Sequence, residues 1–387
     1  MPGSTIDIAL PDGKKLASYR SLPASGGGPG LVLVQVGTAY DLRKVADLFA
    51  EEGYLAMTAD LPAELAGDRL DVERGLACLS AVLQARPVAA GKAGVIGFGP
   101  AGTLAYLAAS RLPIDAAGIF DAADLERQPP TDPELRCPLV LHFGTRERAA
   151  AAAATRAREA LSGDVAVFAY PEAASGFYLP GHASFQHLAA QLAHSRTIAL
   201  LRRTLGPRFD LEALWEAHLN WEFVKVDAEG TMTTMVAEPV NLNVPVLTGG
   251  IGHDGVLSYY KTQFLGQMPK DAHLVPISRT IGADRVVDEH LLCFTHDRQM
   301  DAMLPGVPPT GKYVELPVVV IVTFRGDKVA GEHIYWDQAC LLVQVGKLAK
   351  KGLPVSGSEC AERLRDEGMT VDELRKRWEK DSQRDQN

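Results

Sequence analysis

The feature that most constrains the fold is a regular alternation of short apolar segments and helical segments from residue 30 to about residue 205. The apolar segments are "LVLVQVG", "LAMTADL", "AGVIGFG", "PLVLHFG" and "VAVFAYP". Segments such as "LRKVADLFAEEG" and "AAAAATRAREALSG" between them are typical of helices. This alternation predicts an α/β domain, in which helices cover both faces of a parallel sheet.

The pattern changes near residue 205, so a second domain of a different class is expected. Two amphipathic helices, "DLEALWEAHLNWEFVKVD" and "HDGVLSYYKTQFL", precede four long segments that alternate with period two. Helices followed by such strands predict an α+β domain with an antiparallel sheet. A chain of 387 residues also exceeds what one hydrophobic core usually serves. We therefore predict domains at 1–205 and 206–348, followed by a charged helical tail at 349–387.

Composition excludes several classes of function. A net charge of -9 disfavours nucleic-acid binding, because a phosphate backbone attracts a basic surface. The chain has no signal-peptide pattern and no apolar run of spanning length, so we expect a cytoplasmic protein without a membrane partner. Its five cysteines include no C-x-x-C pair, and its histidines no His-x-x-x-His pair, so neither a disulfide framework nor a metal site is predicted. We expect no cofactor.

Two segments of the first domain carry a family resemblance. "LFAEEGYLAMTADLP" and "GFGPAGTLAYLAASRLPIDAAGIF" resemble the dienelactone hydrolases, which have the α/β-hydrolase fold. The second segment has the strand, tight corner and helix that display a nucleophile in that fold. The resemblance implies a Cys, His and Asp mechanism with a nearby Glu that controls the thiol.

The residues that this mechanism needs are not at the matching positions. Gly99 occupies the nucleophile corner, Glu147 follows the strand that should lead to the acid, and Ser175 stands in the histidine segment. Gln35 is nearest to the position of the controlling Glu, and His182 is the one histidine that could replace the missing base. Because a thiolate mechanism needs both a thiol and a base, we expect the first domain to be catalytically silent.

The segment from "FTHDRQMDAMLPGVPPTGK" to "GDKVAGEHIYWDQ" resembles the SnoaL-like polyketide cyclases of the nuclear transport factor 2-like superfamily. The resemblance covers about residues 207–345. It implies a cone-shaped α+β domain, in which a curved sheet encloses an apolar cavity and inward-facing side chains carry out acid–base chemistry.

Alternation along the last strand of this domain separates two sets of side chains. His333, Tyr335 and Asp337 share one face, and Glu332, Ile334 and Trp336 share the other. We expect the first set to face the cavity, with Asp337 as general acid or base and His333 as its partner. The candidate substrate-binding residues are Tyr335, His253, Trp221, His218, Glu289 and Tyr260.

The sequence does not decide which face of the strand over 286–297 lines the cavity. One set contains Asp288, His290 and His296, and the other contains Glu289 and Cys293. Both sets mix apolar and polar groups, so alternation alone does not decide between them. We expect His296 to act as a second proton-transfer group.

These residues favour a cofactor-independent acid–base enzyme, a cyclase or isomerase that acts on an apolar carbonyl compound. One alternative is a hydrolase that activates water in the cone to open a lactone, ester or epoxide. Another is a protein that binds a small ligand without reacting with it. The expected partners are a small-molecule substrate and a second copy of the chain in a homodimer.

Overall fold

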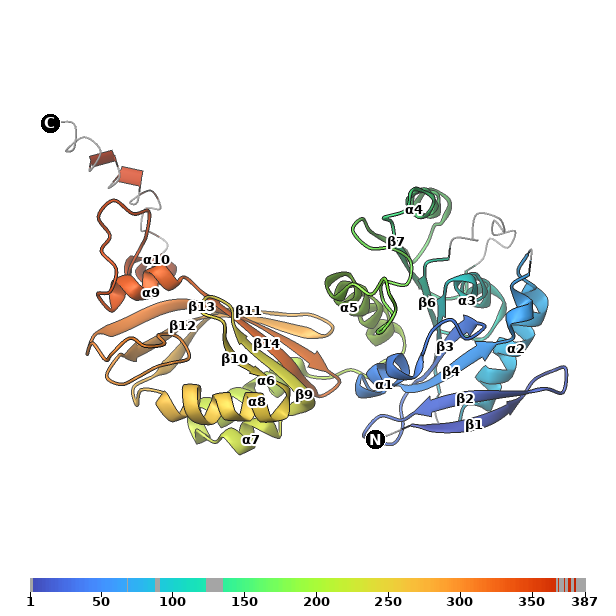
Figure 1. Cartoon of the computed structure of the whole chain (residues 1–387), viewed down its shortest axis with the longest axis horizontal. Helices are drawn as coiled ribbons and strands as arrows, with labels where there is room; N and C mark the ends of the chain where they lie inside the picture. The colour runs from blue at the N-terminus through green and yellow to red at the C-terminus, as the bar shows by residue number, and fades with distance from the viewer. Residues whose placement is uncertain are drawn as a thin grey trace. The chain divides into compact units, whose positions relative to one another are not determined.

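The computed structural model describes residues 3–67, 69–87, 91–122, 135–366, 368, 372, 375–376 and 379–380. The chain divides into two compact units, residues 1–209 and 210–387 (Figure 1).

The first unit is built on an eight-stranded sheet with the order β1-β2-β4-β3-β5-β6-β7-β8. Strands β3 to β8 pair in parallel, which confirms the predicted parallel sheet. An antiparallel hairpin of β1 and β2 extends one edge through β4 and was not predicted. The strands are β1 (Ser4–Ala9), β2 (Lys15–Ser21), β3 (Gly30–Val36), β4 (Leu55–Leu61), β5 (Ala93–Phe98), β6 (Ala116–Phe120), β7 (Leu139–Gly144) and β8 (Val165–Tyr170).

Helices cover the parallel strands because each helix has one apolar face. Helices α2, α3 and α4 share one hydrophobic cluster with the strands, to which they contribute Leu79, Leu104 and Ala154 among others. Helices α1 and α5 lie outside that cluster and are joined to each other by buried polar groups. The helices are α1 (Arg43–Glu51), α2 (Val72–Ala85), α3 (Pro100–Arg111), α4 (Arg148–Ala160) and α5 (His187–Thr204).

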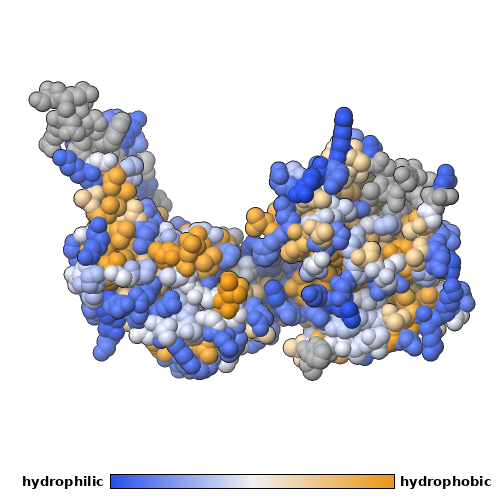
Figure 2. Space-filling model, in the orientation of Figure 1, coloured by the Kyte–Doolittle hydropathy of each residue, from blue (hydrophilic) through white to orange (hydrophobic). Residues whose placement is uncertain are grey.

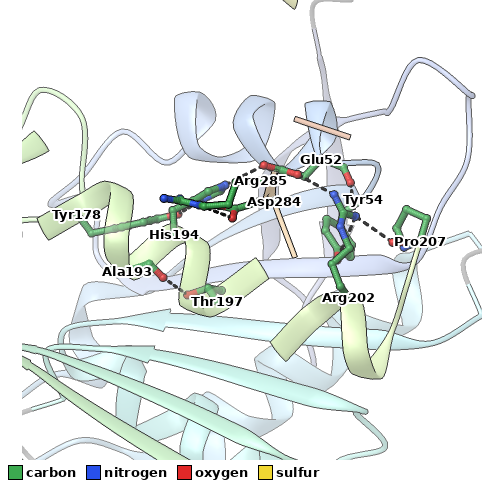
Figure 3. Close-up of polar contacts among 10 residues, drawn as sticks. All are labelled: Glu52, Tyr54, Tyr178, Ala193, His194, Thr197, Arg202, Pro207, Asp284 and Arg285. Carbon is green, nitrogen blue, oxygen red and sulfur yellow. Dashed lines mark hydrogen bonds and ion pairs between the residues drawn. The ribbon is translucent and has the colours of Figure 1, made fainter. Parts of the chain in front are cut away.

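A buried glutamate at the end of α1 connects that helix to α5 (Figure 3). Glu52 is 1% exposed, and its carboxylate accepts from Arg202 at 2.7 Å and lies 3.0 Å from Nε2 of His194. The same guanidinium donates to the backbone carbonyls of Glu52 and Pro207. The other ring nitrogen of His194 meets the Tyr178 hydroxyl at 3.0 Å. The Glu52 carboxylate thus joins α1 to α5, and the Arg202 guanidinium also holds the segment at Pro207.

The second unit has a six-stranded sheet with the order β10-β9-β14-β13-β12-β11. The predicted long strands are present and antiparallel, and one parallel pair, β14 with β9, adds the early part of the unit to the sheet. The strands are β9 (Met235–Asn243), β10 (Thr248–Ile251), β11 (His273–Ile281), β12 (Arg285–Thr295), β13 (Tyr313–Arg325) and β14 (Lys328–Trp336).

Helices lie on both sides of this sheet. Figure 1 shows α6 (Leu211–Leu219), α7 (Ala228–Met232) and α8 (Gly252–Tyr259) on one side, and α9 (Gln338–Gln344) and α10 (Glu359–Arg365) on the other. Both predicted amphipathic helices end in π-helical turns, at Asn220–Lys225 and Tyr260–Phe264. Helix α10 belongs to the predicted tail, of which most residues after 366 lie outside the described ones.

Among the described residues, no helix combines the length and the hydrophobicity that crossing a membrane requires. The face drawn in Figure 2 is a mosaic of hydrophilic and hydrophobic side chains.

The Glu52 cluster leads to a prediction about the stability of the first unit. Replacing Arg202→Met leaves a buried carboxylate without its main cation, which should lower the free energy of unfolding by about 3–5 kcal/mol. Denaturant unfolding, followed through hydrogen exchange of β4 and α5, measures this change. Arg203→Met is the matched control, because Arg203 pairs with Asp164 where both side chains are more than half exposed. Such surface pairs contribute about 0–1 kcal/mol, so equal losses in the two variants would contradict the prediction.

Candidate functional site

The nucleophile corner of the first unit has the expected backbone and no reactive side chain. Gly99 joins β5 to α3 with φ 57° and ψ -126°, in the left-handed half of the map that favours glycine. Its backbone N–H donates to the carbonyl of Phe120 at 2.8 Å. The small pocket beside it is lined by Tyr40, Phe98, Gly99, Phe120, Asp121, Gly176, Tyr178 and Leu179. None of these residues is Cys, Ser or His.

The polar side chains near this corner form hydrogen bonds to the backbone of neighbouring loops. The Asp121 carboxylate accepts from the backbone N–H groups of Gly144 at 2.8 Å and Gly176 at 2.9 Å. Burial raises the pKa of Asp121, although these two hydrogen bonds oppose the shift. Gln35 is bonded to the backbone of Tyr40 and to Asp60.

The remaining positions of the expected mechanism are not among the lining residues, but the Ser175 side chain hydrogen-bonds to the carboxylate of Asp121, which does line the pocket. Glu147 and Ser175 are exposed. His182 accepts from the Ser184 N–H and packs edge-on against Tyr40.

The second unit encloses a larger cavity, with about 560 Å³ of unfilled space that is partly open to solvent. Its walls are mainly apolar and come from the helices on one side and from β9, β12, β13 and β14 on the other. The lining residues are Trp215, Leu219, Glu222, Phe223, Asn241, Asn243, Tyr259, Phe264, Leu274, His290, Leu292, Ala302, Met303, Val318, Val320, Glu332, Ile334 and Trp336.

This lining corrects the expected orientation of β14. Glu332, Ile334 and Trp336 face the cavity, and His333, Tyr335 and Asp337 belong to the opposite face. The period-two alternation is correct, but the helices pack on the other side of the strand from the one expected. Asp337 is exposed and begins α9, where its carboxylate accepts from the N–H groups of Ala339 and Cys340.

A cluster of ionisable side chains lies at the Glu332 end of the cavity. Nε2 of His218 is 3.3 Å from Oε1 of Glu222 and 3.3 Å from Oε1 of Glu332. The Tyr260 hydroxyl donates to Glu332 at 2.9 Å and lies 3.4 Å from the same histidine nitrogen. All three charged side chains are at most 4% exposed. Glu222 and Glu332 line the cavity, whereas His218 and Tyr260 stand behind them.

The other ring nitrogen of His218, Nδ1, takes part in a short chain of hydrogen bonds. The Thr234 hydroxyl donates to the carbonyl of Thr231 at 2.6 Å, so it accepts from Nδ1–H of His218 at 2.6 Å. Nδ1 therefore carries a proton, and Nε2 is the nitrogen that exchanges protons with the two carboxylates.

The charged groups of this cluster shift the pKa values of His218 and Glu222. Burial alone would lower the pKa of His218, but the attraction of Glu222 and Glu332 outweighs it and raises that pKa to about 10. Burial raises the pKa of Glu222, and the nearby Glu332 adds to the rise, while His218 opposes it. Two carboxylates in one dry site do not both ionise readily. The two carboxyl groups thus favour a cationic His218 at neutral pH, and the pKa of Glu222 is raised.

Local irregularity brings these groups together. His218 and Glu222 are four residues apart, but Glu222 belongs to the π-helical turn that continues α6. Tyr260 begins the second π-helical turn, directly after α8. Such turns widen a helix by one residue and occur frequently at functional sites. The His-x-x-x-Glu spacing in "HLNWE" was a signal from which sequence reasoning could have identified Glu222.

Two further polar side chains in the cavity wall lack partners among the described residues. Asn241 on β9 lies directly opposite Glu332 on β14, and its Oδ1 is buried without a hydrogen bond. Nδ1 of His290 on β12 is likewise buried without one, and burial lowers the pKa of this histidine. A neutral amide and a neutral imidazole are thus available to a polar group of a ligand.

The structure brings together two of the nine side chains expected in the site, His218 and Tyr260, and both contact the carboxylates rather than the cavity. The others lie outside the lining. His296 is buried under the loop at 310–311, where Nδ1 meets the Thr310 hydroxyl at 3.1 Å. His253 is exposed beside Asp254, Trp221 packs over Gly230, and Glu289 accepts from Ser278. These side chains therefore lie at the surface or make contacts outside the cavity.

The inward face of β12, which alternation left open, is the set with Asp288 and His290. Asp288 accepts from the indole of Trp215 at 2.7 Å and pairs with Arg279 at 2.8 Å. On the other face, Leu291 and Cys293 are covered by Ala361 of α10. Each face of β12 therefore packs against other elements of the unit.

His218, Glu222 and Glu332 are also the described residues that could hold a metal ion, with one ligand atom each and all three atoms within 4.8 Å of one another. A His and two carboxylates suit a divalent cation. The same three atoms already satisfy one another by hydrogen bonds and ion pairing.

The charge state of His218 predicts how stability changes with pH. Its pKa is about 10 in the folded chain and 6.5 ordinarily, so the folded state holds a proton that the unfolded state releases between these values. The stabilisation is complete below pH 6.5 and is lost as pH rises through 10. All four tryptophans follow residue 209, so urea unfolding monitored by tryptophan fluorescence reports on this unit.

His218→Gln should lose that decline in stability between pH 6.5 and 10. His253→Gln should keep it, because His253 is half exposed and lies outside the cluster. An unchanged pH profile in the His218 variant would refute the charged histidine.

Comparisons with known proteins concern mostly the first unit. The model of the Dienelactone hydrolase family matches residues 64–205. A relative from Azospirillum brasilense, assigned by name as a carboxymethylenebutenolidase, is 29% identical over 230 residues, which are 52% of this chain and 99% of the relative. The Carboxymethylenebutenolidase of Pseudomonas putida is 26% identical over 223 residues, which are 51% of this chain and 94% of the relative.

Solved structures of two kinds each match part of the chain. The dienelactone hydrolase of Anabaena variabilis has 20% identity and a TM-score of 0.43, and the match covers 53% of this chain and 98% of that one. A protein of Jannaschia sp. CCS1, assigned by name as a SnoaL-like polyketide cyclase, has 16% identity and a TM-score of 0.30, with coverage of 37% and 99%. The family-model match, residues 64–205, thus lies wholly within the first unit and shows a dienelactone hydrolase domain there.

Proposed function

We propose that the second unit is an acid–base enzyme that moves a proton at a carbon next to the carbonyl of an apolar small molecule. Isomerisation and ring closure of a polyketide-like compound belong to this class of reaction. The observation that carries the proposal is the buried His218 between Glu222 and Glu332, with both carboxyl groups at the wall of an apolar cavity.

Glu332 is the proposed base. It lines the cavity, and its carboxylate is held by the Tyr260 hydroxyl at 2.9 Å and by the cationic His218 at 3.3 Å. These two donors fix the carboxylate at the wall of the cavity, where it can abstract a proton from a substrate. His218 and Tyr260 are therefore positioning residues, because they act through Glu332.

Glu222 is the proposed acid. Its burial and its proximity to Glu332 raise its pKa, which suits a group that delivers a proton to the substrate. His218 contacts both groups and allows the proton to be redistributed after each turnover.

The wall of the cavity supports an apolar substrate with a polar group at each end. Asn241 lies opposite Glu332, where its buried Oδ1 can accept a hydrogen bond from a hydroxyl group of the substrate. His290 is on β12, separated from β14 by β13, and can bind a second polar group. Between them the wall is formed by Val318, Val320 and Ile334.

We propose that the first unit is catalytically silent. Gly99 offers no nucleophile, and the Asp121 carboxylate is occupied by two backbone N–H groups of neighbouring loops. The unit keeps a complete hydrophobic core without that chemistry.

Hydrolysis is the second candidate. The match of residues 64–205 to a hydrolase family favours it, as do the names of the curated relatives. In this case Glu332 would activate a water molecule in the cavity, and Glu222 would protonate the leaving oxygen of a lactone or ester.

The acid–base proposal is tested by proton exchange. In deuterium oxide, the full chain should introduce deuterium next to the carbonyl of 2-tetralone, an apolar ketone, as followed by proton NMR. Glu332→Gln keeps the size of the side chain and removes the base, so the exchange rate should fall by about 10²–10⁴.

Asp337→Asn is the matched control and should leave the exchange rate unchanged, since Asp337 is exposed and caps α9. Equal rates for the wild type and Glu332→Gln would reject Glu332 as the base. Loss of exchange in the presence of a chelator would reject the metal-independent mechanism.

Hydrolysis of a lactone tests whether the first unit is catalytically silent. If hydrolysis of a carboxymethylenebutenolide in ¹⁸O-labelled water is detected, it should survive the double variant Glu147→Ala and Ser175→Ala and disappear in Glu332→Gln. The opposite pattern, with folding unchanged by circular dichroism, would assign hydrolysis to the first unit.

A further inference from the structure

Two cysteines outside the cavity approach each other closely. Sγ of Cys340 on α9 lies 3.2 Å from Sγ of Cys360 on α10. Both thiols also point at one acceptor, the carbonyl of Gly357, at 3.3 Å and 2.9 Å. Two thiols from separate helices are thus held together before any bond forms between them.

The surroundings of this pair suit thiol chemistry. The Cys360 thiol and the Gln344 amide donate to Sγ of Cys340 and lower the pKa of Cys340 to about 7, although burial opposes the shift. Both cysteines line a surface pocket with Pro317, Asp337, Ser356, Arg363 and Leu364. The hydrogen bond with Cys340 and burial raise the pKa of Cys360, so Cys340 is the thiol of the pair that ionises first. Burial also raises the pKa of Cys78, and that of Cys137 to about 12. A lowered pKa and access to a surface pocket thus coincide at Cys340.

We propose that Cys340 and Cys360 form a reversible intramolecular disulfide by exchange with a small disulfide such as oxidised glutathione. The Cys340 thiolate, which lines the surface pocket, attacks one sulfur of the small disulfide and displaces the other as a thiolate. A mixed disulfide forms at Cys340, and the departing thiolate takes the proton from Cys360. The Cys360 thiolate then attacks Sγ of Cys340 and displaces the second small thiolate, which takes a proton from water. Two protein thiols are oxidised, and one small disulfide is reduced to two thiols.

The bond would fasten the C-terminal segment to the sheet. It closes a loop over residues 341–359 and holds α10, whose Ala361 covers Leu291 and Cys293 on the outer face of β12. An ion pair of Arg365 with Glu315 at 2.7 Å already holds the end of α10 on β13. After reduction of the disulfide, only non-covalent contacts would hold this segment on the sheet. This inference does not depend on the proposed catalytic reaction.

The test equilibrates the full chain in buffers of oxidised and reduced glutathione, followed by alkylation under denaturing conditions and peptide mass spectrometry. Two of the five cysteines should lose their reactivity together, and one peptide pair should join Cys340 to Cys360. Hydrogen exchange of α10 should be slower in the oxidised chain and return to its original rate with dithiothreitol.

Matched variants separate a disulfide from simple proximity. Cys360→Ser should accumulate a mixed disulfide with glutathione at Cys340, whereas Cys78→Ser should behave like the wild type, because Cys78 is buried on α2 of the first unit. The proposal is overturned if both thiols remain free in oxidised glutathione, if either one pairs with another cysteine, or if Cys360→Ser carries no mixed disulfide.

Discussion

The second unit depends on the placement of one buried positive charge between two buried carboxyl groups. His218, Glu222 and Glu332 come from α6, the turn that continues it, and β14, and each is at most 4% exposed. Any one of them, buried as an ion without the others, would cost several kcal/mol or would lose its charge. The three together therefore constrain how α6 lies over the sheet, because a shift of one residue would separate the charges.

The same constraint explains the irregular helices. A regular helix would continue past residue 219 with Glu222 in a different direction, and the π-helical turn changes that direction. A second π-helical turn begins at Tyr260, whose hydroxyl bonds to Glu332. Both departures from regular geometry occur where polar groups must reach one point in an otherwise apolar wall.

The first unit uses its buried polar groups differently. Glu52 and Asp121 are also buried carboxyl groups, but Glu52 joins helices and Asp121 joins loops through backbone N–H groups. The side chains that line the pocket at Gly99 include no Cys, Ser or His. The corner keeps its backbone geometry because β5 and α3 still have to be joined by a tight turn, whatever reaction the unit carries out.

The sequence by itself determined the parallel strands of the first unit, the long strands of the second and the two faces of β14, since these follow from hydrophobic periodicity. It also identified Gly99 at the corner, and His218 and Tyr260 as candidates. Only the tertiary structure decided which face of β14 meets the cavity, because alternation is identical on both sides of a strand and the packing of distant helices selects one. The pairing of Glu332 with His218, and of Cys340 with Cys360, joins segments far apart in the chain, and local pattern carries no information about such contacts.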